Sequence, residues 1–99
     1  MGIYWGDHVG HASCLTTQNL AEQLRLADIG GSATIQTFLT ALDGNFHGAL
    51  TFTRAQAEEI RDALNEAAGR ISPTDWQHLA VELAYDAADA AAAGGWTVE

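Results

Sequence analysis

The sequence predicts a mainly α fold, a compact four-helix domain, and three observations support this class. Four times along the chain, a capping residue precedes apolar residues at helical spacing. Glycines stand where these segments are expected to end. The chain has 99 residues, which suits one small domain rather than two. Since no repeat or linker divides the sequence, we expect a single domain over residues 1–99.

Two helices are predicted in the N-terminal half. The first is expected at about residues 17–29, with Thr16 or Thr17 at its start and a glycine pair after its end. The second begins at Ser32 and stops at Gly44. Its core face is marked by apolar residues at positions i, i+3, i+4 and i+7: Ile35, Phe38, Leu39 and Leu42.

Two longer helices are predicted in the C-terminal half. Thr53 and Gln56 have the spacing of a capping box, and Gly69 is placed to end the helix that follows. Residues 72–75 combine a cap, a proline at the first helical position and an acid, which predicts a helix running to about Ala93. The expected core faces consist of apolar residues at helical spacing: Ala57, Ile60, Leu64, Ala68, Trp76, Leu79, Ala80, Leu83, Ala87 and Ala91.

Three short segments outside these helices have the composition of strands. They cover residues 3–5, 49–52 and 96–98, and each contains aromatic or β-branched residues. Strands of this length are not stable alone. We therefore expect a minor two- or three-stranded sheet formed by the terminal segments and residues 49–52.

The charge of the chain restricts its partners. Thirteen acidic residues against four basic ones give a net charge of −9, so a nucleic-acid backbone would be repelled and direct nucleic-acid binding is disfavoured. The same charge favours a protein partner with a basic surface. No apolar stretch approaches the roughly 20 residues of a membrane span, and the first residues lack the features of a secretory signal. We expect a cytoplasmic protein that does not bind membranes.

The third and fourth predicted helices carry acidic faces that local stability does not explain, because like charges four residues apart oppose helix formation. The fourth helix also has a second, weakly apolar sector that includes Val81 and Tyr85. We predict that these features bind a partner, while a solvated face that maintains solubility is the alternative. The predicted partner-binding residues are Glu58, Glu59, Asp62, Glu66, Glu82, Asp86, Asp89, Val81 and Tyr85.

A cluster near the N-terminus has the residue types of a metal site. The candidate ligands are His8, His11, Cys14 and His47. The paired Cys-x-x-Cys element of zinc ribbons is absent, which favours local hydrogen bonding with Cys14 as a small buried side chain. No nucleophile motif surrounds Cys14 or Ser13. We therefore expect no catalytic residues, no cofactor and no bound metal, and we keep a metal-stabilised or metal-dependent protein as the alternative.

The run from Thr53 to Trp96 has a Gln-Ala helix start, an Ile-x-x-x-Leu core, a Ser-Pro-x-Asp-Trp helix start and an alanine-rich end. With these features it resembles a group of small uncharacterised proteins found in Streptomyces and their phages. The resemblance implies an actinobacterial or phage setting and assigns no functional residues. The absence of lysine, together with abundant alanine and glycine, agrees with a GC-rich genome.

These observations together predict a non-enzymatic acidic protein-interaction module. It would bind another protein through an acidic helical face, or associate with itself through the second sector of the fourth helix. In the setting that the resemblance implies, a concrete form is a phage or mobile-element protein that binds and inhibits a host factor. If that factor binds nucleic acid, the carboxylates can take the places of phosphates, since both present anionic oxygens to Arg and Lys.

Overall fold

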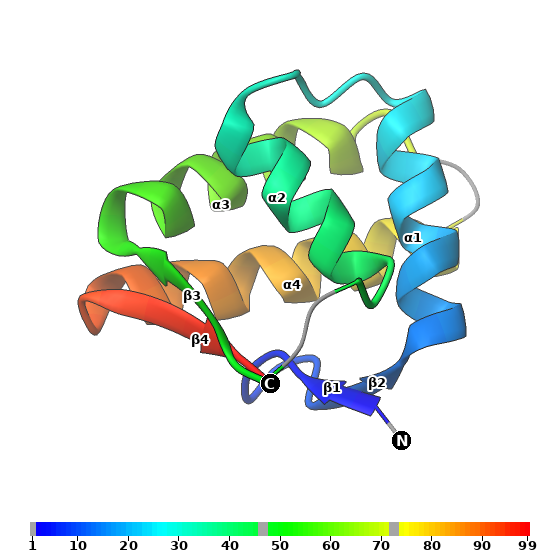
Figure 1. The fold of residues 1–99 in the computed structure, drawn as a ribbon. Helices are drawn as coiled ribbons and strands as arrows, with labels where there is room; N and C mark the ends of the chain where they lie inside the picture. Colours follow the sequence, from blue (N-terminus) through cyan, green and yellow to red (C-terminus); the bar gives the residue numbers. More distant parts are fainter. Residues whose placement is uncertain (1, 46–47, 72–73) are drawn as a thin grey trace.

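The computed structural model describes residues 2–45, 48–71 and 74–99, and in these ranges the chain forms four helices and two small antiparallel sheets (Figure 1). The mainly α class with a minor sheet component is confirmed. None of the described helices combines the length and apolar character that a bilayer span requires. The elements in chain order are β1 (Gly2–Tyr4), β2 (His11–Ser13), α1 (Cys14–Leu26), α2 (Ala33–Leu42), β3 (Leu50–Thr53), α3 (Arg54–Ala68), α4 (Thr74–Ala92) and β4 (Gly95–Val98).

Side-chain caps set the starts of the two middle helices. At the start of α2, the Ser32 hydroxyl accepts a hydrogen bond from the Ile35 amide at 3.1 Å. At the start of α3, the Thr53 hydroxyl accepts from the Gln56 amide at 3.2 Å, and the Gln56 side chain accepts from the Thr53 amide at 2.8 Å. Both predicted starts are therefore confirmed. The predicted start of α4 at residues 72–73 lies outside the described residues.

The first helix differs from its prediction at both ends. It begins directly after Ser13, whose hydroxyl accepts a hydrogen bond from the Thr16 amide at 3.2 Å, so the cap precedes the predicted start. It ends at Leu26. Asp28 then adopts a left-handed conformation with φ of 56°, which short polar side chains tolerate better than most. The chain thus leaves the helix before it reaches the glycine pair at residues 30–31.

The core lies between the helices. Helices α3 and α4 pack along one another, and α1 and α2 contact this pair and each other (Figure 1). The apolar spacing identified most of the core correctly, although Trp76 and Leu79 are only half-buried. The fully or almost fully buried side chains include Leu20, Leu24, Phe38, Leu42, Ile60, Leu64 and Leu83.

The sheet prediction is correct for one pair of strands. Strands β3 and β4 are antiparallel, with Phe52 opposite Trp96. Strand β1 pairs instead with β2, whose sequence His-Ala-Ser lacks the residues typical of strands. The two sheets meet where Tyr4 and Glu99 exchange backbone hydrogen bonds of 2.8 and 3.4 Å. The two ends of the described chain are therefore adjacent (Figure 1).

Four aromatic rings join these sheets to the helices. Trp5, Trp96, Phe38 and Phe52 pack together with centroid separations from 5.8 to 6.4 Å. The indole N–H of Trp96 donates a hydrogen bond to the Trp5 carbonyl at 2.8 Å. Aromatic pairs of this kind add to the stabilisation from buried area. The N-terminal hairpin, residues 2–13, is thereby fixed against the C-terminal strand.

We predict that Leu64→Ala and Leu83→Ala each lower the free energy of unfolding by about 2–4 kcal/mol, because each removes buried surface and leaves a cavity between α3 and α4. The two side chains are 0% and 1% exposed. Leu26→Ala is the matched control, because Leu26 is 82% exposed and its loss is expected to cost less than about 0.5 kcal/mol. Urea denaturation of the three variants measures the difference, and equal stability of all three would contradict the core assignment.

Candidate functional site

An exposed row of side chains runs along α4 and is termed the α4 stripe. Successive spacings of three and four residues hold its members within a sector of about 80°, since each residue turns the helix by about 100°. The sequence of α4 contains no Lys or Arg. The stripe therefore presents acidic groups along the helix without a basic residue of that helix to offset them. Its members are Asp75, His78, Glu82, Tyr85 and Asp89.

An open hollow of about 380 Å³ adjoins the stripe where α4 passes the C-terminal end of α3. Val81 and Tyr85 line it from α4, and Ala68 and Gly69 line it from the other side. Tyr85 is 56% exposed, whereas Val81 is half-buried. The predicted second apolar sector of α4 is thus partly covered within the domain and partly open at Tyr85.

Three of the four predicted acidic residues of α3 have basic or hydroxyl partners within the domain. Glu66 forms an ion pair with Arg70 at 2.6 Å, and Asp62 forms one with Arg61 at 2.9 Å. Exposed pairs of this kind add little stability, but each places a positive charge next to the acid. The hydrogen bond with Asp62 also raises the pKa of Arg61. Of the other two predicted acids, Glu58 is half-buried. Glu59 accepts a hydrogen bond from the Ser32 hydroxyl.

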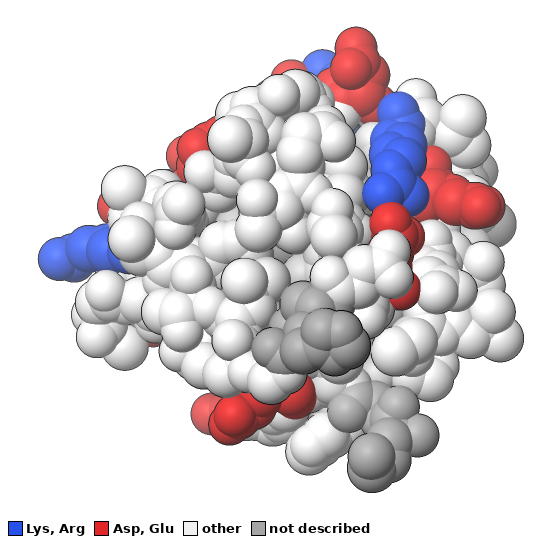
Figure 2. Space-filling model, in the orientation of Figure 1, with Lys and Arg blue, Asp and Glu red and all other residues white. Residues whose placement is uncertain are grey.

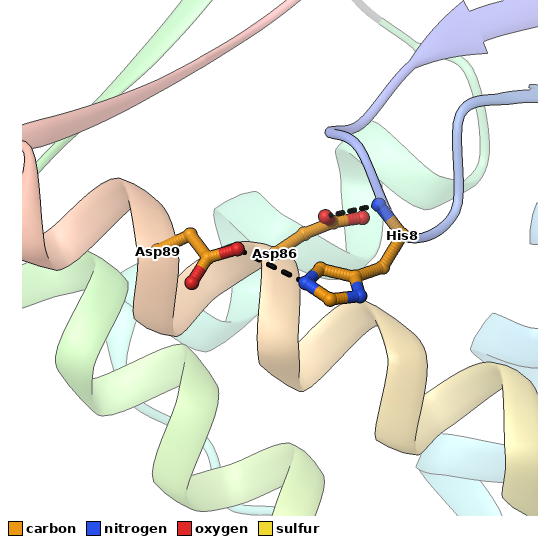
Figure 3. Close-up of side chains that lie close together, drawn as sticks. All are labelled: His8, Asp86 and Asp89. Carbon is orange, nitrogen blue, oxygen red and sulfur yellow. Dashed lines mark hydrogen bonds and ion pairs between the residues drawn. The ribbon is translucent and has the colours of Figure 1, made fainter.

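The prediction that Asp86 lies on an exposed acidic strip is wrong. Asp86 is 3% exposed, and one of its carboxylate oxygens accepts a hydrogen bond from the His8 amide at 2.9 Å (Figure 3). The other oxygen accepts from the Val9 amide, also at 2.9 Å. By helical position Asp86 borders the α4 stripe, which explains the prediction. The turn of the N-terminal hairpin covers that border and buries the carboxylate.

The close approach of the hairpin to Asp86 requires a glycine at position 6. A Cβ atom on Gly6 would lie 2.5 Å from the Asp86 carboxyl carbon, well inside van der Waals contact. Sequence reasoning missed this contact, because 78 residues separate His8 from Asp86 and no local pattern connects them. The only local feature in the sequence that relates to this contact is the glycine between Trp5 and Asp7.

His8 links the same hairpin to the exposed side of α4. Its Nε2 atom lies 3.0 Å from Oδ2 of Asp89 (Figure 3). Its ring packs against Tyr85 with centroids 5.4 Å apart. One ligand atom from each of His8, Asp86 and Asp89 lies within 4.8 Å of the others. These three side chains are termed the His8 cluster. The hairpin therefore supports the stripe and adds an imidazole to its C-terminal end.

The metal ligands considered from sequence do not converge in the described part of the chain. Of that set, His8 alone joins a group of three or more ligating side chains there, and its partners are the two aspartates of α4. The ring of His11 packs against Tyr4 at a centroid distance of 5.1 Å, and Cys14 is half-buried at the start of α1. His47 lies outside the described residues. The Ser13 hydroxyl serves as the cap of α1.

The face of the molecule over α2 differs from the α4 stripe. Figure 2 shows that Asp, Glu and Arg side chains lie mainly around the margin of this face and leave its centre uncharged. The sequence of α2 contains no charged residue. Arg25 and Asp43 form an ion pair at 2.7 Å. This face therefore offers less than α4 that would attract a charged partner.

The sequence over residues 6–99 matches a family described as a domain of unknown function, DUF7739. The chain belongs to this family. The match includes the N-terminal hairpin from Gly6 onward and all of α4. It is therefore longer than the run from Thr53 to Trp96 on which the resemblance seen in the sequence was based. No curated protein and no solved structure matches the chain.

We predict that Asp86→Asn lowers the free energy of unfolding of this DUF7739 domain by about 1–3 kcal/mol. An asparagine side chain has one acceptor and one donor group, so its amide would face one of the two backbone N–H groups that Asp86 now accepts. Asp89→Asn is the matched control on the same helix, because the Asp89 side chain is 71% exposed. Its change should stay within about 0.5 kcal/mol. Urea denaturation distinguishes the two, and an unaffected Asp86→Asn would contradict the anchoring role.

A second test concerns the room available at the turn. Gly6→Ala should destabilise the domain by about 1–3 kcal/mol, because the new methyl group overlaps the Asp86 carboxyl group. Gly31→Ala is the control, since nothing lies within 4 Å of a Cβ atom at that position. Thermal denaturation followed by circular dichroism measures both. Equal melting temperatures for the two variants would show that the hairpin does not rest on Asp86.

Proposed function

We propose that this DUF7739 domain is a non-enzymatic protein-binding module and that the α4 stripe, with the hollow at Tyr85, is its binding surface. The observation that carries the proposal is an exposed aromatic side chain set among acids on a helix without Lys or Arg. Tyrosine is enriched among the residues that dominate binding energy at protein interfaces. An apolar hollow beside it provides room for a side chain of the partner.

The partner that fits this surface carries Lys or Arg around an apolar side chain. Within the described residues, Asp75 and Glu82 take part in no ion pair, so their charges are available to a partner. Their attraction for a basic surface would speed encounter and would weaken with salt, because exposed charges are screened over about 8–10 Å. The apolar contact at Tyr85 would add affinity that depends less on salt.

The acids of α3 take a secondary part in this proposal. Arg61 and Arg70 lie next to Asp62 and Glu66 and reduce the negative potential there. We expect these residues to contribute to long-range attraction rather than to direct contact. Association of two copies through α4 is also disfavoured, because a symmetric contact would place the acidic stripe against itself.

The concrete form of the proposal is a small phage or mobile-element protein of the cytoplasm that binds and inhibits a host factor. The acidic stripe suits a factor whose own ligand is a nucleic acid, since carboxylates along a helix present anionic oxygens to Arg and Lys as phosphates do. Support for this form comes from the charge of the stripe together with the resemblance to actinobacterial and phage proteins.

The test compares partner capture from an actinobacterial lysate by the wild-type domain and four variants. Glu82→Arg and Tyr85→Ala change the stripe, while Glu22→Arg and Leu26→Ala make the same changes on exposed positions of α1. We expect wild type and both α1 variants to retain the same protein, and each α4 variant to bind it at least about tenfold more weakly. Quantitative mass spectrometry and then titration of the purified partner give the measurement.

Salt and the α3 acids provide the discriminating controls. Binding of wild type should weaken between low and high salt, and Glu82→Arg should show a smaller dependence. A double variant, Glu58→Arg with Glu66→Arg, distinguishes the contribution of α3 from that of α4. It should reduce only the salt-dependent part of the binding affinity. Full retention of every captured protein by Glu82→Arg and Tyr85→Ala at both salt concentrations would contradict the α4 proposal.

A further inference from the structure

The N-terminal hairpin places an imidazole over two carboxylates of α4, and Figure 3 shows the three side chains close together. We propose that the His8 cluster binds one divalent transition-metal ion, with Zn²⁺ as the best match. This site differs from the metal ligands considered from sequence, of which it shares only His8. The site also goes beyond protein binding, because none of its three ligands lines the hollow at Tyr85.

The spacing between the His8 and Asp89 ligand atoms suits an ion of this size. Zinc lies about 2.0–2.2 Å from imidazole nitrogen and carboxylate oxygen. At the tetrahedral angle that zinc prefers, two such ligands are therefore about 3.4 Å apart. The His8 Nε2 and Asp89 Oδ2 atoms are 3.0 Å apart. Their hydrogen bond can thus be exchanged for two metal–ligand bonds with only small side-chain movements.

Asp86 supplies an observation that points to a cation independently of this spacing. Its carboxylate is 3% exposed, and no ion pair with it exists among the described residues. Buried charges in proteins are as a rule paired with an opposite charge or bound to a metal. Asp86 has two amide donors instead, and each oxygen retains a second lone pair. A cation beside Asp86 would therefore complete the environment of a buried charge.

The surroundings are open to an incoming ion and attract one. A hollow of about 260 Å³ beside the cluster is lined by Asp86 and Asp89 and also by Asp7. The Asp7 carboxylate accepts a hydrogen bond from the Tyr4 hydroxyl at 2.6 Å, which raises the pKa of Tyr4. Among the described residues, no Lys or Arg lines this hollow. Three carboxylates without a nearby Lys or Arg give the site a negative potential.

The ligand set decides which cation fits. Magnesium and calcium prefer oxygen ligands alone, whereas imidazole nitrogen suits zinc and other transition metals. Three protein ligands leave at least one position to water, so the ion would be exchangeable and accessible from solvent. Asp86 keeps its amide hydrogen bonds with or without the ion, so the fold does not depend on the metal. Contact of the His8 ring with Tyr85 helps to hold the imidazole in place.

The test is calorimetric titration of Zn²⁺ into the full chain after treatment with a chelator. We expect one ion per chain, and at least about tenfold weaker binding in His8→Ala and in Asp89→Asn, because even the partners of metal ligands contribute that much. Both side chains are largely exposed, so these variants should keep the circular dichroism spectrum of wild type. Titrations with Mg²⁺ and Ca²⁺ should show much weaker binding.

The matched controls are the other two described histidines. His11→Ala removes a ring that packs on Tyr4, and His78→Ala removes an exposed ring from α4, so neither should alter zinc binding. In the NMR spectrum of wild type, zinc should shift the imidazole resonances of His8 and leave those of His11 and His78 unchanged. Absence of saturable binding, equal loss in His11→Ala, or equal affinity for Mg²⁺ and Ca²⁺ would each overturn the proposal.

Discussion

The hydrogen bonds from the His8 and Val9 amides to the buried carboxylate of Asp86 decide how the first residues of the chain meet its last helix. Burying a carboxylate is unfavourable unless its oxygens find donors, and the turn of the hairpin supplies two. Gly6 leaves the room that this approach needs. The same docking places the hairpin against the C-terminal strand, where Trp96 donates to the Trp5 carbonyl. One polar contact and one aromatic cluster thus fix the hairpin at two points.

Helix α4 can take part in all of these contacts because its faces differ in chemistry. Leu83 and its apolar neighbours fill the core, Asp86 binds the hairpin at one border of that face, and the α4 stripe remains in solvent. The absence of Lys and Arg from the helix leaves the stripe acidic along its length. On α3, by contrast, Arg61 and Arg70 accompany the acids. These differences are the reason that we propose α4 rather than α3 as the surface for a basic partner, although the two helices carry similar acidic residues.

Sequence reasoning was correct where the signal is local. Thr53 and Gln56 are three residues apart, so their capping box was visible, and the spacing of Leu64 and its neighbours identified a buried face. It was wrong for Asp86, because helical position gives the direction of a side chain but not what covers it. The His8 cluster was missed for the same reason, since it joins segments that no short-range pattern connects. The pairing of β1 with β2 was missed because residues 11–13 contain none of the β-branched residues or Phe, Tyr and Trp that mark a strand. What could be predicted of the site is its acidic helix, and what could not is the hairpin that completes it.

Asp89 belongs to both the α4 stripe and the His8 cluster, which couples the two proposals. Its carboxylate either binds His8, coordinates an ion together with His8, or faces a basic partner, and one oxygen cannot serve two of these at full strength. An ion in the cluster would also lower the negative charge at that end of the stripe. By thermodynamic linkage the two effects are equal. If the ion weakens the binding of a basic partner by a given factor, the partner weakens the binding of the ion by the same factor. Tyr85 and Glu82 lie outside the cluster, so the remainder of the stripe would keep its affinity whichever group occupies Asp89.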